Sequence, residues 1–155
     1  MTAGEKIIFK NTLKQYCVST IEQRVANAQL SMQQAQEAAN EEEKSSAGDK
    51  YETSRAMNHL EKDMHAKQLE ANRQELAVVS SIDCDKIYDT VKTGCVVICE
   101  GASFFIAAGL GKVSIEGKNI YLLSPNAPVA ALLFNKKCGD HIAFNNKVFL
   151  IRDLY

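Results

Sequence analysis

The first half of the chain lacks the residues that interrupt helices. Residues 5–80 contain no proline and a single glycine, Gly48, and they are rich in alanine, glutamine, glutamate, lysine, methionine and leucine. These residues are strong helix formers, whereas a proline inside a helix costs about 3 kcal/mol. The composition therefore predicts two long helices that are separated near Gly48.

Apolar and small residues recur in this half at alternating spacings of four and three, which is the a/d pattern of a coiled coil. The clearest run is Ile21, Val25, Ala28, Met32, Ala35 and Ala39, with Leu13 and Cys17 upstream. A single seam cannot bury itself, so the two helices are expected to fold back on each other. We therefore predict an antiparallel coiled-coil hairpin over residues 1–81, with its tip at about 43–52.

The second helix continues the pattern less regularly. Met57, Leu60 and Met64 are expected to resume the seam after the tip. Leu69, Leu76 and Val79 then follow in a shifted phase. A stutter in the coiled coil is the predicted cause of this shift.

The second half of the chain has the composition of strands and turns. Residues 94–155 hold both prolines, most of the glycines and most of the valine, isoleucine and phenylalanine. Strands are predicted at 94–100 and 103–109, a hairpin at 112–124 turning at Glu116–Lys118, a short helix at 126–134 ending in Leu132, Leu133 and Phe134, a turn at 136–140, and a last hairpin at 141–155 turning at Asn145–Asn146. With residues 82–93 as a linker, the fold class is α+β, with the helices followed by a small antiparallel sheet and one helix that covers it.

Charge and cysteine usage exclude several classes of function. The net charge is −1, so the chain as a whole has no attraction for nucleic acid or for anionic membranes. Its five cysteines are an odd number without a CxxC pair, which favours buried, reduced thiols in a cytoplasmic protein and argues against a metal site of its own. We find neither a signal-peptide pattern nor a membrane-spanning run, and neither a phosphate-binding loop nor a nucleophile elbow. We therefore expect no membrane partner, no small-molecule substrate and no self-contained enzyme.

Two carboxylates follow the break between the helices, in the stretch Ser45–Ser54, which reads SSAGDKYETS. Asp49 has the residue type preferred at a helix N-cap, and Glu52 stands three positions later, where a capping box places its acid. Capping alone would account for both residues. A capping acid can also bind a ligand, so a functional role at the tip remains open.

The C-terminal segment 124–144 resembles the closing motif of the Gre transcription elongation factors. In that family a Ser-Pro pair begins a short helix ending in Ala-Leu-Leu, and a Lys-Lys-x-Gly-Asp turn leads into the last two strands. The matching residues here are Ser124, Pro125, Ala131, Leu132, Leu133, Lys136, Lys137, Gly139 and Asp140. The family also has the predicted layout, an N-terminal antiparallel coiled coil followed by an FKBP-like domain, here residues 94–155.

The resemblance implies a function in transcription. Gre factors insert the coiled coil into the secondary channel of bacterial RNA polymerase, where two acids at the tip help to hold the second Mg²⁺ while backtracked RNA is cut. Gly48-Asp49-Lys50-Tyr51-Glu52 preserves the spacing of those acids, so Asp49 and Glu52 are the expected catalytic pair. The resemblance implies that the partner is RNA polymerase and that the chain meets the nascent RNA 3′ end indirectly. It also implies that the chain is a cofactor of the polymerase nuclease activity and that the chain binds no metal by itself. Its expected polymerase-binding residues are Ser124, Pro125, Leu132, Leu133, Lys136, Lys137, Gly139 and Asp140.

Two other readings stay open. A rival register aligns Tyr51 with a family tyrosine and puts Lys44 and Ala47 at the acid positions, which would give a channel-binding regulator that does not promote cleavage. The third reading is an adaptor unrelated to transcription, with a coiled coil for partner helices and the sheet as a binding module.

Overall fold

The structure is a computed structural model that describes the backbone of residues 1–45 and 49–155 and the side chains of residues 1–41 and 52–155. Two long helices, α1 (Ala3–Ser45) and α2 (Asp49–Ser80), precede a six-stranded sheet with one short helix. The predicted α+β class is therefore confirmed. The chain divides into a sheet unit (Met1–Val18 and Ala77–Tyr155) and a two-helix unit (Ser19–Leu76), so the sheet unit includes both the predicted linker 82–93 and the start of α1.

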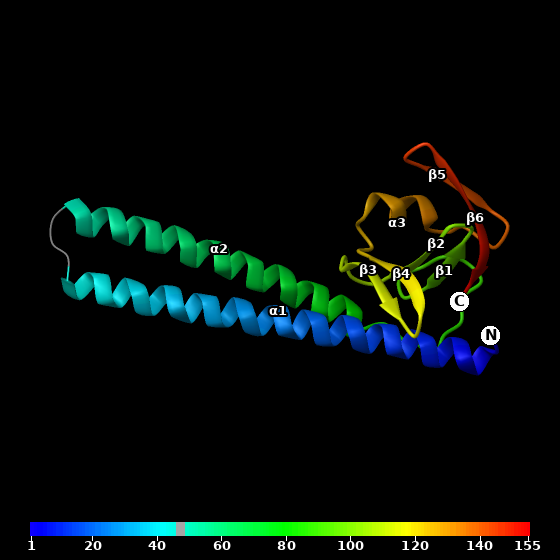
Figure 1. The fold of residues 1–155 in the computed structure, drawn as a ribbon, viewed down its shortest axis with the longest axis horizontal. Helices are drawn as coiled ribbons and strands as arrows, with labels where there is room; N and C mark the ends of the chain where they lie inside the picture. Colours follow the sequence, from blue (N-terminus) through cyan, green and yellow to red (C-terminus); the bar gives the residue numbers. More distant parts are fainter. Residues whose placement is uncertain (46–48) are drawn as a thin grey trace. The chain divides into compact units, whose positions relative to one another are not determined.

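In the two-helix unit, α1 and α2 run antiparallel and side by side (Figure 1). The seam predicted for α1 is confirmed, because Ile21, Ala28 and Ala35 are buried and the seam residues between them are half-buried. Within this unit, Lys62 Nζ on α2 donates a hydrogen bond to Gln36 Oε1 on α1 at 3.1 Å.

The seam predicted for the beginning of α2 is wrong. Met57, Leu60 and Met64 are 65%, 66% and 68% exposed. Among the side chains of α2 that the structure describes, the buried or half-buried ones are instead Ser54, Asn58, His65, Leu69, Asn72, Glu75, Leu76 and Val79. The apolar residues at the end of α2 determine which side of the helix faces α1. Because the helix is uninterrupted, the same side faces inward at its beginning, where it carries polar residues.

The sheet has the strand order β3-β4-β2-β1-β6-β5. Its strands are β1 (Val96–Cys99), β2 (Ala102–Ile106), β3 (Gly111–Ile115), β4 (Lys118–Leu123), β5 (His141–Phe144) and β6 (Lys147–Leu154). All pairs are antiparallel except β2 with β4, which corrects the prediction of a purely antiparallel sheet. The chain passes from β2 to the edge position of β3, and β4 then folds back between them, so β4 runs in the same direction as β2.

Two predicted β-hairpin turns are confirmed. Glu116 and Gly117 join β3 to β4, and Asn145 and Asn146 join β5 to β6, all four with positive φ. Two-residue turns of this kind favour glycine and asparagine because those residues tolerate the left-handed conformation.

One face of the sheet packs against the short helix α3 (Pro128–Leu133). Ala130 and Leu133 of α3 join a core with Val97, Phe104, Ile106, Ile142 and Ile151, all buried. The sequence predicts that Leu132, Leu133 and Phe134 cover the sheet, but Leu132 is 40% exposed and does not. A six-residue helix has one inward face, and Ala130 and Leu133 occupy it.

Lys10, near the start of α1, is fully buried in the sheet unit. Its Nζ donates a hydrogen bond to the Lys86 carbonyl oxygen at 2.6 Å and lies 4.9 Å from the centre of the Tyr88 ring. Burial lowers the pKa of the Lys10 ammonium group. These partners explain how a charged side chain is accommodated among apolar residues.

The five cysteines are free, and four of them are buried. Cys138 is exposed. We expect a disulfide reagent to modify one thiol rapidly in the native protein and all five after unfolding, because reaction requires access to the thiolate. Rapid native modification of two or more thiols, counted by mass spectrometry, would contradict this burial pattern.

Burial also couples Cys99 to alkaline stability. It raises the pKa of the Cys99 thiol from 9.0 to about 11, so the folded state keeps this proton in a range where the unfolded state loses it. The stability that this adds is present below pH 9.0 and is lost as the pH rises through about 11. Relative to Cys99→Ala, the wild-type free energy of unfolding should fall by about 2 kcal/mol across that window in urea titrations, and a constant difference would contradict it.

Candidate functional site

The predicted tip acids lie at the start of α2. Asp49 is the first residue of this helix and Glu52 follows one turn later, where negative charge suits the positive end of the helix dipole. The Glu52 side chain is exposed, whereas the Asp49 side chain lies outside the described residues, as do those of Lys44 and Ala47 from the rival register. The predicted capping box requires the Asp49 side chain, so it also lies outside the described residues.

Of the two tip acids, only Glu52 has a side chain that the structure describes. Among the side chains that the structure describes, no group of three or more His, Cys, Asp or Glu residues is placed to hold a metal ion. Mg²⁺ takes six oxygen ligands and usually retains several waters. Two carboxylates one turn apart would therefore supply part of a coordination shell whose other ligands come from elsewhere.

The segment 124–140 forms α3 and a tight turn. Ser124 Oγ accepts a hydrogen bond from the Asn126 amide at 3.2 Å, and its carbonyl oxygen accepts one from the Ala127 amide at 3.0 Å. Ser124 and the half-buried Pro125 thus lead the chain into α3.

The turn after α3 is closed by its own polar groups. Asp140 Oδ2 accepts a hydrogen bond from the Lys137 amide at 2.8 Å, and the Asp140 amide donates one to the Lys137 carbonyl at 3.0 Å. Gly139 takes a φ of 92°, and its amide donates to the Ile151 carbonyl at 2.9 Å. Gly139 and Asp140 therefore hold the turn against β6.

Of the eight predicted polymerase-binding residues, Leu133 is buried and the other seven are exposed or half-buried. Leu132 and Lys137 are exposed and Lys136 is half-buried, so their side chains are available to a partner. Leu133 is fully buried, so it can contribute only by holding α3 in place.

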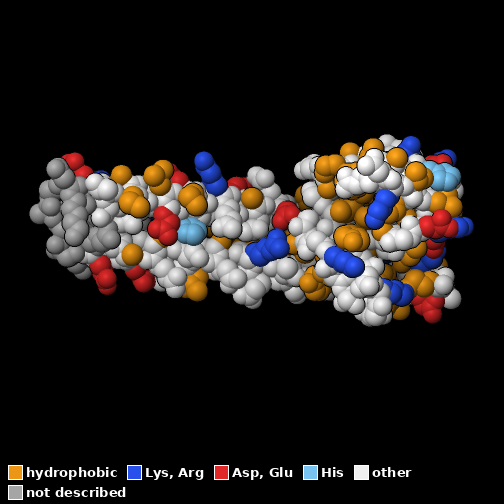
Figure 2. Space-filling view, turned by 45° about the horizontal axis from the view of Figure 1, so that its top comes forward, with side chains coloured by type: hydrophobic (Ala, Val, Ile, Leu, Met, Phe, Trp, Pro, Cys, Tyr) orange, Lys and Arg blue, Asp and Glu red, His pale blue; other side chains and the backbone are white. Residues whose placement is uncertain are grey.

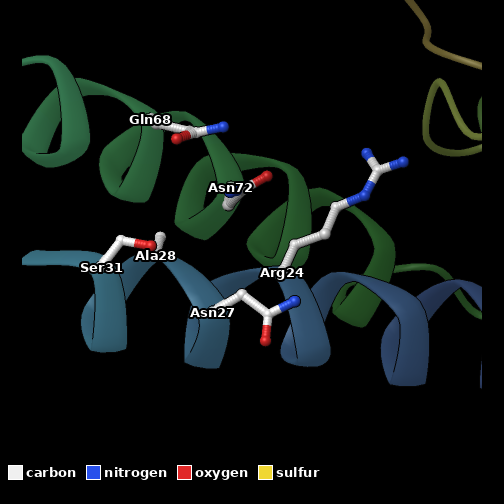
Figure 3. A pocket seen from close by; sticks show the side chains of 6 residues that line it. All are labelled: Arg24, Asn27, Ala28, Ser31, Gln68 and Asn72. Carbon is white, nitrogen blue, oxygen red and sulfur yellow. The ribbon is translucent and has the colours of Figure 1, made fainter.

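A polar hollow of about 320 Å³ lies between α1 and α2 within the two-helix unit (Figure 3). Arg24 extends from α1 toward α2, with Gln68 and Asn72 on the facing helix. The hollow is lined by Arg24, Asn27, Ala28, Ser31, Gln68 and Asn72. None of these six is a carboxylate, imidazole or thiol, so the hollow can hold a polar or anionic group but supplies no general base.

Sequence reasoning missed two features of the two-helix unit. One is this hollow, and the other is the exposed row of Met57, Leu60 and Met64, which was assigned to the seam. The helical phase of Leu69, Leu76 and Val79, extended toward residue 54 at about 3.6 residues per turn, could have placed Met57, Leu60 and Met64 on the outer face of α2.

Comparison of the chain with protein-family models, with curated proteins and with solved structures gave no match. In the part of the chain that the structure describes, no helix combines the length and apolarity that crossing a membrane requires.

Proposed function

We propose that this chain is a Gre-like factor that binds bacterial RNA polymerase at the secondary channel and stimulates cleavage of backtracked RNA. The observation that carries the proposal is the position of Asp49 and Glu52 in the first turn of α2, directly after the connection between two long helices. In this proposal the two-helix unit is an antiparallel coiled coil and the sheet unit is FKBP-like.

The dimensions of the two-helix unit support this role. The part of α1 between Ser19 and Ser45 spans about 40 Å at about 1.5 Å per residue. A carboxylate at the end of such a unit can act inside a narrow channel of a much larger partner.

The chemistry of the acids supports it as well. Hydrolysis of RNA by two Mg²⁺ ions requires one ion to orient the attacking water and the other to stabilise the leaving oxygen. Asp49 and Glu52 would supply hard oxygen ligands to the more weakly held ion, while the polymerase supplies the remaining ligands and the catalysis. Residues Leu132, Lys136 and Lys137 would contact the polymerase outside the channel, held in place by Ser124, Pro125, Leu133, Gly139 and Asp140.

A transcript-cleavage assay tests the proposal directly. A stalled, backtracked elongation complex is assembled with RNA polymerase from the source organism and Mg²⁺, and shortening of labelled RNA is followed with and without the chain. Faster cleavage supports the proposal. Binding without faster cleavage would favour a non-cleaving channel regulator, the outcome expected if Lys44 and Ala47 occupy the acid positions. Absence of binding to RNA polymerase would favour the adaptor unrelated to transcription.

A further inference from the structure

The row of Met57, Leu60 and Met64 on α2 is a surface that the two-helix unit leaves uncovered. The three side chains recur at spacings of three and four, so they share one face of the helix. Each is about two-thirds exposed, and together with Ser54, Asn58 and Glu61 they line a shallow hollow of about 330 Å³. Figure 2 shows several exposed hydrophobic side chains along the two-helix unit, with acidic side chains beside them.

Three large apolar side chains in one row exceed the scatter of single exposed residues that is normal on a protein surface. Methionine has a flexible, polarisable side chain that adapts to the partner it meets. The row ends toward the sheet unit at Lys67, which takes the next position three residues after Met64. The apolar surface is therefore confined to about two turns of α2.

Acidic residues border the row on both sides. Glu61 follows Leu60 on one border and lines the hollow, and Asp63 precedes Met64 on the other border, with both side chains exposed. Glu61 Oε1 lies 3.7 Å from His65 Nε2, an ion pair that is charged only when His65 is protonated. A partner that covers the row therefore meets negative charge at both edges.

The acidic borders determine which kind of surface can cover the row. A second copy of the row would bring Glu61 and Asp63 against acidic residues of its own kind, and like charges at close range disfavour association. A surface with apolar side chains bordered by lysine or arginine would bury the row and pair both carboxylates.

We propose that the row formed by Met57, Leu60 and Met64, with its acidic borders Glu61 and Asp63, docks an apolar, basic-edged surface of the partner protein. This inference rests on the proposed function, which makes that partner RNA polymerase. The docking surface would hold α2 laterally, so that the acids one to two turns earlier in the helix reach a fixed position.

The test is the binding of fluorescently labelled chain to RNA polymerase, titrated at moderate and high salt. The triple variant Met57→Gln/Leu60→Gln/Met64→Gln should raise Kd by about tenfold or more, because exposed apolar surface is no longer buried on binding. Glutamine preserves helix propensity, so circular dichroism should show unchanged helicity. The single variant Leu60→Gln is compared with Leu30→Gln, which removes a leucine that is 53% exposed on α1 and should not change Kd.

A second pair of variants tests the borders. Glu61→Gln/Asp63→Asn should weaken binding severalfold at moderate salt and reduce the dependence of Kd on salt. Unchanged Kd in this variant would contradict the basic edge of the partner surface.

The outcomes separate the inference from the function on which it rests. If wild type binds and the triple variant binds equally well, the docking surface is overturned and the proposed function stands. If wild type does not bind the polymerase, both fail. If sedimentation shows a wild-type dimer that the triple variant loses, the row is covered by a second copy, and the inference is overturned.

Discussion

The double variant Asp49→Asn/Glu52→Gln is expected to lose stimulation of transcript cleavage by about 100-fold while it still binds RNA polymerase. The amides keep the size and hydrogen-bonding capacity of the acids, and asparagine is as good an N-cap as aspartate. The substitution therefore preserves the start of α2 and removes only the charged oxygens that would hold Mg²⁺. Cleavage is measured on a backtracked complex at saturating factor, so that binding differences do not enter.

Two controls sharpen this prediction. Glu37→Gln/Glu70→Gln removes the same number of exposed carboxylates elsewhere on the two helices and should leave cleavage unchanged. Lys44→Ala tests the rival register, in which this position replaces an acid. Full activity of Asp49→Asn/Glu52→Gln would show that the two acids only cap α2.

Local signals identified the turns and most of the sheet. Asn145 with Asn146, and Glu116 with Gly117, lie in two-residue turns whose positive φ values a sequence can specify within a few residues. The strands that flank them were predicted because their register follows from the turn. The parallel pairing of β2 with β4 was missed, because no local pattern shows that β4 inserts between β2 and β3.

The inner face of α2 could not be predicted from its most apolar residues. Met57, Leu60 and Met64 are more hydrophobic than Ser54, Asn58 and His65, yet the polar set is the more buried one. A continuous helix has one phase, and the buried Leu69 and Val79 determine it for the whole length. The exposed apolar row is thus a consequence of the rigidity of the helix. It can be predicted from the sequence only by extending the helical phase of Leu69 and Val79 toward the start of α2.

The partners that bury Lys10 could not be predicted from the sequence pattern either. It shares a face with Leu13 and Cys17 at spacings of three and four, so the coiled-coil pattern already places it on the seam. Its burial depends on the Lys86 carbonyl and the Tyr88 ring, which lie more than seventy residues away in the sequence. The predicted polymerase-binding residues on α3 show the same dependence on tertiary structure. Leu132 and Leu133 are adjacent leucines, yet Leu132 is exposed and Leu133 is buried.

Gly94→Ala is expected to destabilise the sheet unit more than the same substitution at Gly101, Gly111, Gly117 or Gly139, where an added Cβ meets no atom within 4 Å. Gly94 has a φ of +90°, and a Cβ placed there would lie 2.7 Å from Ile82 Cγ2, which is closer than real Cβ contacts allow. The left-handed backbone alone costs an alanine roughly 1–2 kcal/mol. The clash adds overpacking of about 1–3 kcal/mol, because Ile82 is buried and has little room to move.

Gly101→Ala is the matched control for this variant. Gly101 has a nearly equal φ of +86°, but a Cβ there meets no atom within 4 Å, so it reports the backbone cost alone. The difference between the two variants in free energy of unfolding, measured by urea denaturation, isolates the contact with Ile82. In a double-mutant cycle, Ile82→Ala should remove the extra cost of Gly94→Ala, because the contacting methyl group is absent. Equal destabilisation by Gly94→Ala and Gly101→Ala would mean that Ile82 yields to the added methyl group, and the expected cost of the contact between Ile82 and Gly94 would then be refuted.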